Sequence, residues 1–521
     1  SRALRSRVRD DAESSAEGAQ GVEGAASATS DALVEPLAAL LTTPHGGACH
    51  QGAASEQREL AVRPSDAHLW LTPCNWHICD APAGGATGAV EQMAVSACPG
   101  SYLRVRWEGG LSSCDTVHLE VDTSAPTMEY MTLSYAFDGG DPLPVVLPHG
   151  NARARIELVS EQPLGPGPHE LWVAILNSRQ SIDRWGGNGD LPDGALRLRA
   201  VLLPPGARTL PPRPKPRRAL FFGDSITEGV GSEFGHGSTG DLLANASTTT
   251  WASRVASALD AECSVVGFGR LGWTQTGNGN VPPFVSGDDA RPSSWNQVWA
   301  GVPRTFYCGA AALDYVFVML GTNDGLVAGR GASHAVRRAV ETWLPAVRQQ
   351  IGPDVKLFVC VPFGGYGSHA PPRRATLSAF DQYMSRHDDH NAFLLDLGPE
   401  AATGLNGFQF GERGMFAGTD ESCDGIHPRT QRHCELGNMV AAAVRRLLDR
   451  DASGGQRSQT LKQLNAASRT QVEQTDDILR EGAPSSPVPA CTGQGSVGAG
   501  RHGSDGTDSS CEPEDPEWVL F

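Results

Sequence analysis

The sequence predicts an all-β domain followed by a doubly wound α/β domain, and three observations support this order. Residues 65–203 contain short β-rich runs separated by turn residues, and no helix of useful length fits among them. Residues 219–450 alternate apolar strand-like runs with amphipathic helical segments, which is the pattern of a parallel sheet with crossover helices. A proline-rich run at 204–218 separates the two patterns. The change of pattern therefore predicts two domains of different class.

About seven strands with turns between them predict a β-sandwich for the first domain. In one strand, Arg104 and Arg106 interleave with Leu, Val and Trp, which is typical of a half-buried strand. The run Asp-Gly-Gly-Asp at 138–141 predicts a hairpin after another strand. The expected strands are 68–71, 102–107, 117–121, 131–137, 155–159, 170–176 and 196–203.

The second domain is expected to hold five strands, 219–222, 264–268, 315–320, 355–362 and 392–397, and four helices, 249–259, 335–350, 375–387 and 430–448. The run 315–320 is continuously apolar, as expected in the middle of a parallel sheet. Pro345 is expected to kink or split its helix, and Gly352 with Pro353 to end it.

The remaining segments have compositions that disfavour packed structure. Residues 1–64 are rich in Ala, Ser, Gly and Glu and are expected to be disordered or of low complexity. Residues 204–218 are so rich in proline that we expect neither helix nor sheet pairing, only a stiff linker. Residues 451–521 form an acidic tail that is expected to be mostly disordered.

The bulk composition limits the kinds of partner that the protein is expected to bind. The net charge of −17 argues against a nucleic acid. No run approaches the ~20 apolar residues of a membrane span. The twelve cysteines lack zinc-finger spacing, so no metal is expected. They favour secretion with some disulfides, and one hypothesis is a bridge between Cys423 and Cys434. Asn245 begins an N-glycosylation sequon, a triplet that is frequent by chance. The sequence does not indicate an oligomeric state.

Two polar residues follow predicted strands, at the edge of the sheet where ligands bind in open α/β folds. Ser225 follows 219–222 and could be a nucleophile if a base takes its proton, although a helix N-cap is equally compatible with its position. Asn323 follows 315–320, and its amide could donate two N–H bonds to a developing oxyanion. An ordinary turn is the alternative for Asn323.

Two further segments could complete such a site. Asp424 lies three residues before His427, so its carboxylate can fold back within one loop and fix the imidazole tautomer. The alternative is an Asp-Gly turn beside a surface histidine. The glycine-rich loop 267–273 could turn backbone N–H groups towards an anion, or its glycines could serve close packing.

The four segments together are far more specific than any one of them. Their order along the chain resembles that of the SGNH hydrolases, the GDSL-like esterase/lipase superfamily. The first block reads Gly-Asp-Ser-Ile, the third reads Gly-Thr-Asn-Asp and the last reads Asp-Gly-Ile-His-Pro. The resemblance implies a flavodoxin-like doubly wound fold for residues 219–450, and ester hydrolysis without metal or cofactor.

The resemblance also implies roles for individual residues. The implied nucleophile is Ser225, the base is His427, the orienting carboxylate is Asp424, and the oxyanion donors are Ser225, Gly269 and Asn323. Gly272 is the rival to Gly269, because this loop aligns imperfectly with the usual block. Asp224 is expected to hold the loop rather than take protons.

A jelly-roll-like sandwich directly before such a domain resembles carbohydrate esterase family 2, which removes acetyl groups from plant polysaccharides. This resemblance covers about 65–450 and implies an acylated carbohydrate as the substrate. Some members of that family use a Ser-His dyad, but Asp424 favours a triad here. Trp273 is expected to line the cleft as a sugar platform, whereas Trp295 and Trp299 could equally belong to the core.

Three other functions fit the same residues. The first is a general carboxylester hydrolase or lipase, although no long apolar lid is evident near the blocks. The second is a carbohydrate-binding protein whose SGNH domain is inactive. The third is an acyltransferase, in which a sugar hydroxyl captures the acyl-enzyme.

Overall fold

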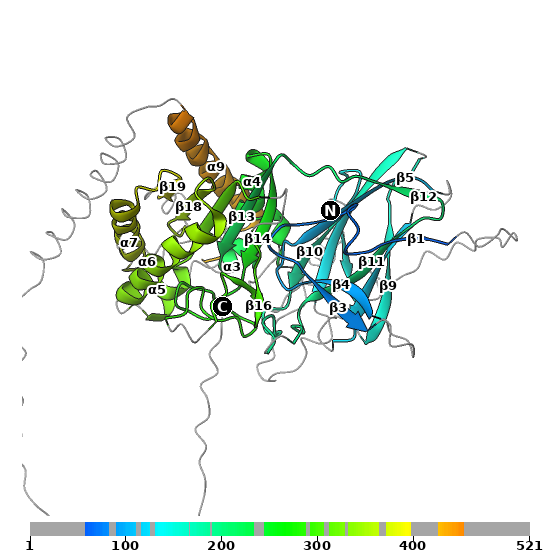
Figure 1. Ribbon diagram of the computed structural model, residues 1–521, viewed down its shortest axis with the longest axis horizontal. Coiled ribbons are helices and arrows are strands. Elements are labelled where there is room, and N and C mark those ends of the chain that lie inside the picture. The colour runs from blue at the N-terminus through cyan, green and yellow to red at the C-terminus, as the bar shows by residue number, and fades with distance from the viewer. Residues whose placement is uncertain are drawn as a thin grey trace, which may run out of the picture. The chain divides into compact units, whose positions relative to one another are not determined.

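The fold was obtained as a computed structural model (Figure 1). It describes residues 58–82, 90–110, 116–125, 131–148, 150–165, 167–187, 190–233, 244–287, 292–306, 312–328, 332–363, 371–397 and 426–452. All of these except the end of the last helix belong to one compact unit, Ser1–Val444.

The strand-rich first domain forms two antiparallel sheets, consistent with a β-sandwich. One sheet has the order β3-β4-β11-β6-β9 with β1 beside β11, and the other has the order β12-β5-β10-β7-β8 with β2 beside β5. A separate core, which includes Trp107, Leu119 and Val173, is buried in this domain. The strands are β1 (Leu60–Val62), β2 (Leu69–Leu71), β3 (His77–Pro82), β4 (Val90–Ser96), β5 (Tyr102–Gly109), β6 (Thr116–Thr123), β7 (Met131–Phe137), β8 (Leu143–Val146), β9 (Asn151–Val159), β10 (Pro168–Ser178), β11 (Leu196–Leu203) and β12 (Ala207–Leu210).

The prediction of an unpaired linker at 204–218 is partly wrong, because β12 lies inside this run. This strand pairs antiparallel with β5, and Thr209 lies opposite Trp107. Its four residues contain no proline, although prolines stand on both sides. A short strand at the edge of a sheet tolerates such neighbours. The run 204–218 therefore continues the β domain before the next domain begins at Arg217.

The second domain contains a five-stranded sheet in which every pair of neighbours is parallel. Its order, β14-β13-β17-β18-β19, is 2-1-3-4-5 along the domain, as in flavodoxin-like sheets. The strands are β13 (Arg217–Gly223), β14 (Ala261–Gly267), β17 (Tyr315–Met319), β18 (Lys356–Cys360) and β19 (Ala392–Leu395). A small ribbon joins β15 (Gln297–Trp299) to β16 (Val302–Pro303).

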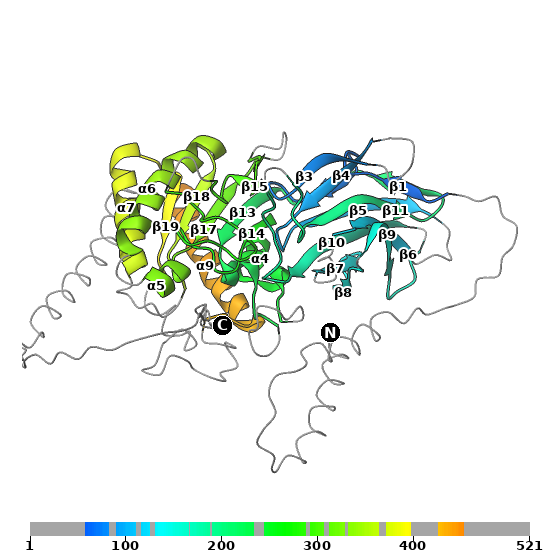
Figure 2. The ribbon, with the colours of Figure 1, turned by 90° about the horizontal axis from the view of Figure 1, so that it is seen from below.

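The helices around this sheet are α3 (Ser225–Glu228), η3 (Ser247–Thr249), α4 (Trp251–Ala258), α5 (Thr322–Ala328), α6 (Ala332–Ile351), α7 (Pro371–His387) and α9 (Thr430–Ala452). Pro345 does not split α6, in contrast to one form of the expectation. The adjacent residues Phe221 and Phe222 contact different helices, Phe221 through Trp251 of α4 and Phe222 through Trp343 of α6. Since successive side chains on a strand point to opposite faces, α4 and α6 cover the two faces of the sheet (Figure 2).

Candidate active site

The turn from β13 into α3 presents Ser225. Gly223 ends the strand, and a Cβ there would lie 2.0 Å from Oγ1 of Thr227, so only glycine fits. Asp224 caps the helix, and its Oδ1 accepts the N–H of Ile226 at 3.0 Å. Ser225 is the first helical residue and is 8% exposed. The N-cap of this helix is therefore Asp224, and the alternative that Ser225 caps the helix is wrong.

Parallel pairing brings three of the predicted segments to one edge of the sheet. Gly223 at the end of β13 lies opposite Gly267 of β14 and Met319 of β17. The chain continues from these ends into Ser225, into the glycine-rich loop and into Asn323. Ligands bind at this carboxyl edge in open α/β sheets, so the arrangement is suited to a site.

His427 reaches the same place from just before α9. Its Nε2 lies 2.7 Å from Oγ of Ser225, and the imidazole is 5% exposed. The start of α9 is anchored beside this contact, because the Thr430 N–H donates to the carbonyl of Ser232 at 2.8 Å. Further along, Nδ1 of His433 accepts the N–H of Trp251 at 3.2 Å. These contacts anchor the start of α9 and keep the His427 imidazole against the Ser225 hydroxyl.

Burial dominates the electrostatics around this pair. It raises the pKa of Asp224 to about 6, while the Ile226 N–H and the charge of His427 act in the opposite direction. It lowers the pKa of His433 to about 3, so that imidazole is neutral near pH 7 and serves as an acceptor. The predicted partner of His427, Asp424, lies outside the described residues, and so does Cys423.

Asn323 and Asp324 hold the loop that follows β14. Nδ2 of Asn323 donates to the carbonyl of Leu271 at 3.0 Å, which uses one of its two N–H groups. The Asp324 carboxylate accepts the N–H groups of Trp273 at 2.8 Å and Thr274 at 2.9 Å. Burial raises the pKa of Asp324, and these hydrogen bonds oppose that shift. Sequence reasoning assigned no role to Asp324, although it directly follows the predicted asparagine.

Both glycines considered as oxyanion donors have a partner for their N–H group. Gly269 donates to Oε2 of Glu228 at 2.7 Å, and Gly272 donates to the carbonyl of Gln275 at 3.1 Å. A hydrogen bond to a carboxylate is the stronger of the two kinds. The Gly269 amide is therefore the less available donor, which argues against the preference for Gly269 over Gly272.

The structure contradicts the expectation that Trp273 lines a cleft. Trp273 is 1% exposed, and its indole N–H donates to the carbonyl of Leu320 at 3.0 Å. Its ring packs edge-on against Phe284 and Trp343 in the domain core. The residue ends the glycine-rich loop, its backbone N–H donates to Asp324, and its side chain lies in the core. Trp295 and Trp299 are also buried.

The second domain matches a known protein family. Residues 221–433 match the model of the GDSL-like Lipase/Acylhydrolase family. This part of the chain is therefore similar to a GDSL-like lipase/acylhydrolase domain. This confirms the resemblance inferred from the sequence blocks. A search of curated protein sequences finds no match.

Solved structures resemble the chain over both domains. A family two carbohydrate esterase from Cellvibrio japonicus has 15% identity and a TM-score of 0.54, over 75% of this chain and 98% of that one. An acetyl xylan esterase, Est2A, from the rumen bacterium Butyrivibrio proteoclasticus has 14% identity and a TM-score of 0.53, over 75% and 99%. An active-site mutant of a family two carbohydrate esterase from Clostridium thermocellum has 17% identity and a TM-score of 0.51, over 74% and 99%. At these identities the likeness shows the fold.

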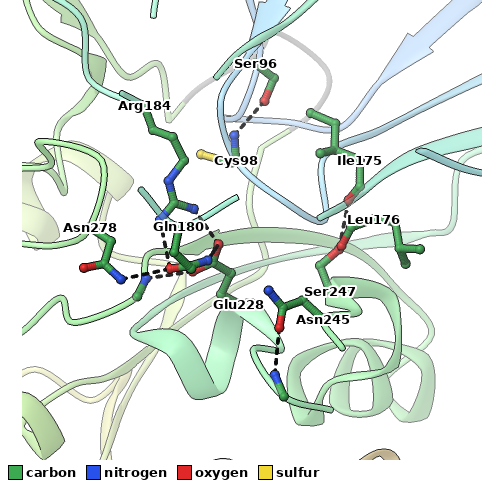
Figure 3. Close-up of polar contacts among 12 residues, drawn as sticks. Ser96, Cys98, Ile175, Leu176, Gln180, Arg184, Glu228, Asn245, Ser247 and Asn278 are labelled. Carbon is green, nitrogen blue, oxygen red and sulfur yellow. Dashed lines mark hydrogen bonds and ion pairs between the residues drawn. The ribbon is translucent and has the colours of Figure 1, made fainter. Parts of the chain in front are cut away.

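Glu228 is a further buried acid of the second domain that the sequence analysis did not single out. Glu228 ends the helix that Ser225 begins, and its carboxylate contacts Arg184 and Gln180 of the β domain as well as Gly269 (Figure 3). The partners lie 41 to 48 residues away along the chain. The available signal was an acidic residue three positions after the predicted nucleophile, but nothing local indicated its partners.

The described residues contain neither a metal-binding cluster nor a membrane-spanning helix. No group of three or more His, Cys, Asp or Glu side chains there is placed to hold a metal ion. No helix in that part of the chain is both long and apolar enough to cross a membrane.

Proposed function

We propose that the protein is a serine esterase that removes acyl groups, chiefly acetyl, from carbohydrate. The observation that carries the proposal is the 2.7 Å approach of His427 Nε2 to Ser225 Oγ at the carboxyl edge of the sheet. In this account Ser225 is the nucleophile, His427 is the base and Asp424 orients the imidazole.

The reaction runs through an acyl-enzyme in two steps. His427 takes the hydroxyl proton as Ser225 Oγ attacks the ester carbonyl, and the resulting imidazolium returns the proton to the departing sugar oxygen. Water then attacks the acyl-enzyme with the same base. The oxyanion in each step would be stabilised by the Ser225 N–H, the second amide N–H of Asn323 and a glycine N–H of the loop after β14.

The substrate class rests on the arrangement of both domains. A strand-rich domain precedes the α/β domain, and the solved structures that match across both domains include a family two carbohydrate esterase and an acetyl xylan esterase. The family match by itself supports an SGNH-type esterase or acylhydrolase. Acetyl specificity and the carbohydrate substrate are the parts of the proposal that need a test.

A series of aryl esters from acetyl to decanoyl separates the two main hydrolase functions. We expect kcat/KM to be highest for acetyl and to fall with each lengthening of the chain, and Ser225→Ala to remove the activity at every length. A maximum at long chains would contradict a deacetylase and favour a general carboxylester hydrolase or lipase. No hydrolysis of any ester would favour a binding protein with an inactive domain.

A further inference from the structure

A short segment of the β domain contacts both loops of the proposed active site. It follows β10 directly and contains Gln180 and Arg184. Nε2 of Gln180 donates to Oε1 of Glu228 at 2.8 Å, and Nη1 of Arg184 forms an ion pair with the same oxygen. The other oxygen, Oε2, accepts the N–H of Gly269 at 2.7 Å. Figure 3 shows these side chains meeting at the Glu228 carboxylate.

The same segment also contacts the loop after β14 without using Glu228. Oε1 of Gln180 accepts from Nδ2 of Asn278 at 3.2 Å, and the Arg184 N–H donates to the carbonyl of Gly279 at 3.0 Å. The Arg184 guanidinium lies 5.1 Å from the ring centre of Phe268. The segment is thus fitted to the loop by shape and polarity, and not through a single bond.

The ion pair is fully buried, which makes it a rigid connection. The Arg184 side chain is 0% exposed and that of Glu228 is 2% exposed. A buried charge without its partner is strongly unfavourable, so each member restricts the position of the other. A replacement of both by apolar residues of similar size removes that penalty and is often neutral for stability.

We propose that Arg184 and Gln180 are positioning residues of the acylhydrolase site, acting through Glu228. This inference rests on the proposed function. The helix α3 has only four residues, with Ser225 first and Glu228 last, so a shift of Glu228 moves the nucleophile. Because Glu228 also holds Gly269, it fixes the spacing between Ser225 and the loop that faces it. The β domain therefore completes the catalytic geometry.

The test compares two double variants of the full chain. We call the buried Arg184–Glu228 ion pair the brace. The brace variant, Arg184→Met with Glu228→Leu, removes this ion pair and leaves neither of its charges behind. Arg199→Met with Asp122→Leu is the matched control, because that buried pair, 2.8 Å apart, joins β11 to β6 inside the β domain. For each variant, kcat and KM are measured on an aryl acetate, together with thermal unfolding and amide hydrogen exchange by mass spectrometry.

The brace variant should remain folded, lose about 100-fold in kcat, and change KM much less, because a misplacement of about 1 Å costs on that order. Its segments 225–229 and 267–273 should exchange faster than in the wild type, and the control should retain both rate and protection. Equal kcat and equal protection in the two variants would overturn the proposal, and so would a rise in kcat.

If the brace variant fails to fold, Gln180→Ala replaces it, since this change leaves the ion pair in place. We expect a smaller fall in kcat with the same local loss of protection, and no change in either would overturn the inference. A wild-type protein inactive on every ester would refute the proposed function. The exchange measurement would still decide whether the segment holds the two loops.

Discussion

Asn323 contacts the carbonyl of Leu271 with one N–H group and has a second available. If the second N–H stabilises the oxyanion, Asn323→Ala should lower kcat about 10²- to 10³-fold with little change in KM. Asn323→Asp keeps the size of the side chain and loses the N–H donor, so it should lower kcat by a comparable factor. Steady-state kinetics on an aryl acetate measures both variants, and a kcat within twofold of the wild type would remove Asn323 from the oxyanion hole.

Asp224 should make stability depend on pH. Its pKa is about 6 in the folded protein against 3.8 for an ordinary Asp, so the folded state binds more protons between those values. The free energy of unfolding should therefore fall as pH rises from 4 to 6. Asp224→Asn keeps an acceptor for the Ile226 N–H and cannot ionise.

Urea unfolding of wild type and Asp224→Asn at pH 4, 5, 6 and 7 measures this effect. The stability of the wild type relative to the variant should drop across the window by up to about 3 kcal/mol, the equivalent of two pKa units. Parallel stability curves would show that Asp224 does not titrate in this range.

The site residues that could be predicted are those whose position follows from the nearby chain. Ser225 and Asn323 each come directly after an apolar strand, and parallel strands place such positions at one edge. The orientation of Trp273 and the partners of Glu228 could not be predicted. The ring of Trp273 packs on Phe284 and on Trp343, which lies 70 residues further along the chain, and Arg184 comes from another domain.

At the scale of elements, runs rich in β-forming residues between turn signals were a reliable guide. The strand 131–137 was predicted at its observed bounds, and so was 196–203. The strands missed in the first domain, β1, β3, β4, β8 and β12, include very short ones and ones that contain proline, such as β8 with Pro144. Their pairing depends on a long neighbouring strand that offers an open edge, which the local sequence does not reveal.

The inward Trp273 makes a prediction about the core. Trp273→Ala should lower the free energy of unfolding by about 3–5 kcal/mol, because the substitution leaves a cavity beside Phe284 and Trp343. Trp273→Phe should cost less. Chemical denaturation measures both. If Trp273→Ala had wild-type stability but a raised KM for acetylated oligosaccharides, Trp273 would be a sugar platform after all and not a core residue.

At the scale of the whole molecule, the two domains share buried polar contacts. Glu262 of β14 is fully buried and accepts from Nη1 of Arg104 at 2.9 Å and from the Tyr102 hydroxyl. Arg304 donates to the carbonyl of Cys74 at 2.7 Å. Residues 217–452 produced alone would carry Glu262 and Glu228 without these partners.

We therefore expect the excised fragment 217–452 to be poorly folded and inactive, in contrast to a catalytic domain with an optional binding module. Circular dichroism, size-exclusion chromatography and aryl acetate hydrolysis against the full chain measure this. A monomeric, cooperatively unfolding fragment with full activity would contradict the shared interface and the brace together.

Secretion stays a prediction for the whole chain, and the described residues add two facts. Cys79, Cys98, Cys263, Cys360 and Cys434 are free thiols, so the hypothesis of a bridge from Cys434 to Cys423 gains no support. Asn245, the first residue of the sequon, is buried, and its side-chain Oδ1 accepts the N–H of Gly231 at 2.9 Å. In the folded protein that side chain is not available for a glycan.

In the proposed reaction, Ser225, activated by His427, removes acetyl groups from carbohydrate. Acetate release from acetylated oligosaccharides by the wild type, by Ser225→Ala and by His427→Ala measures this most directly. We expect acetate release by the wild type and a fall of several orders of magnitude in both variants with the fold intact. Undiminished release by Ser225→Ala, or no release by the folded wild type, would contradict it.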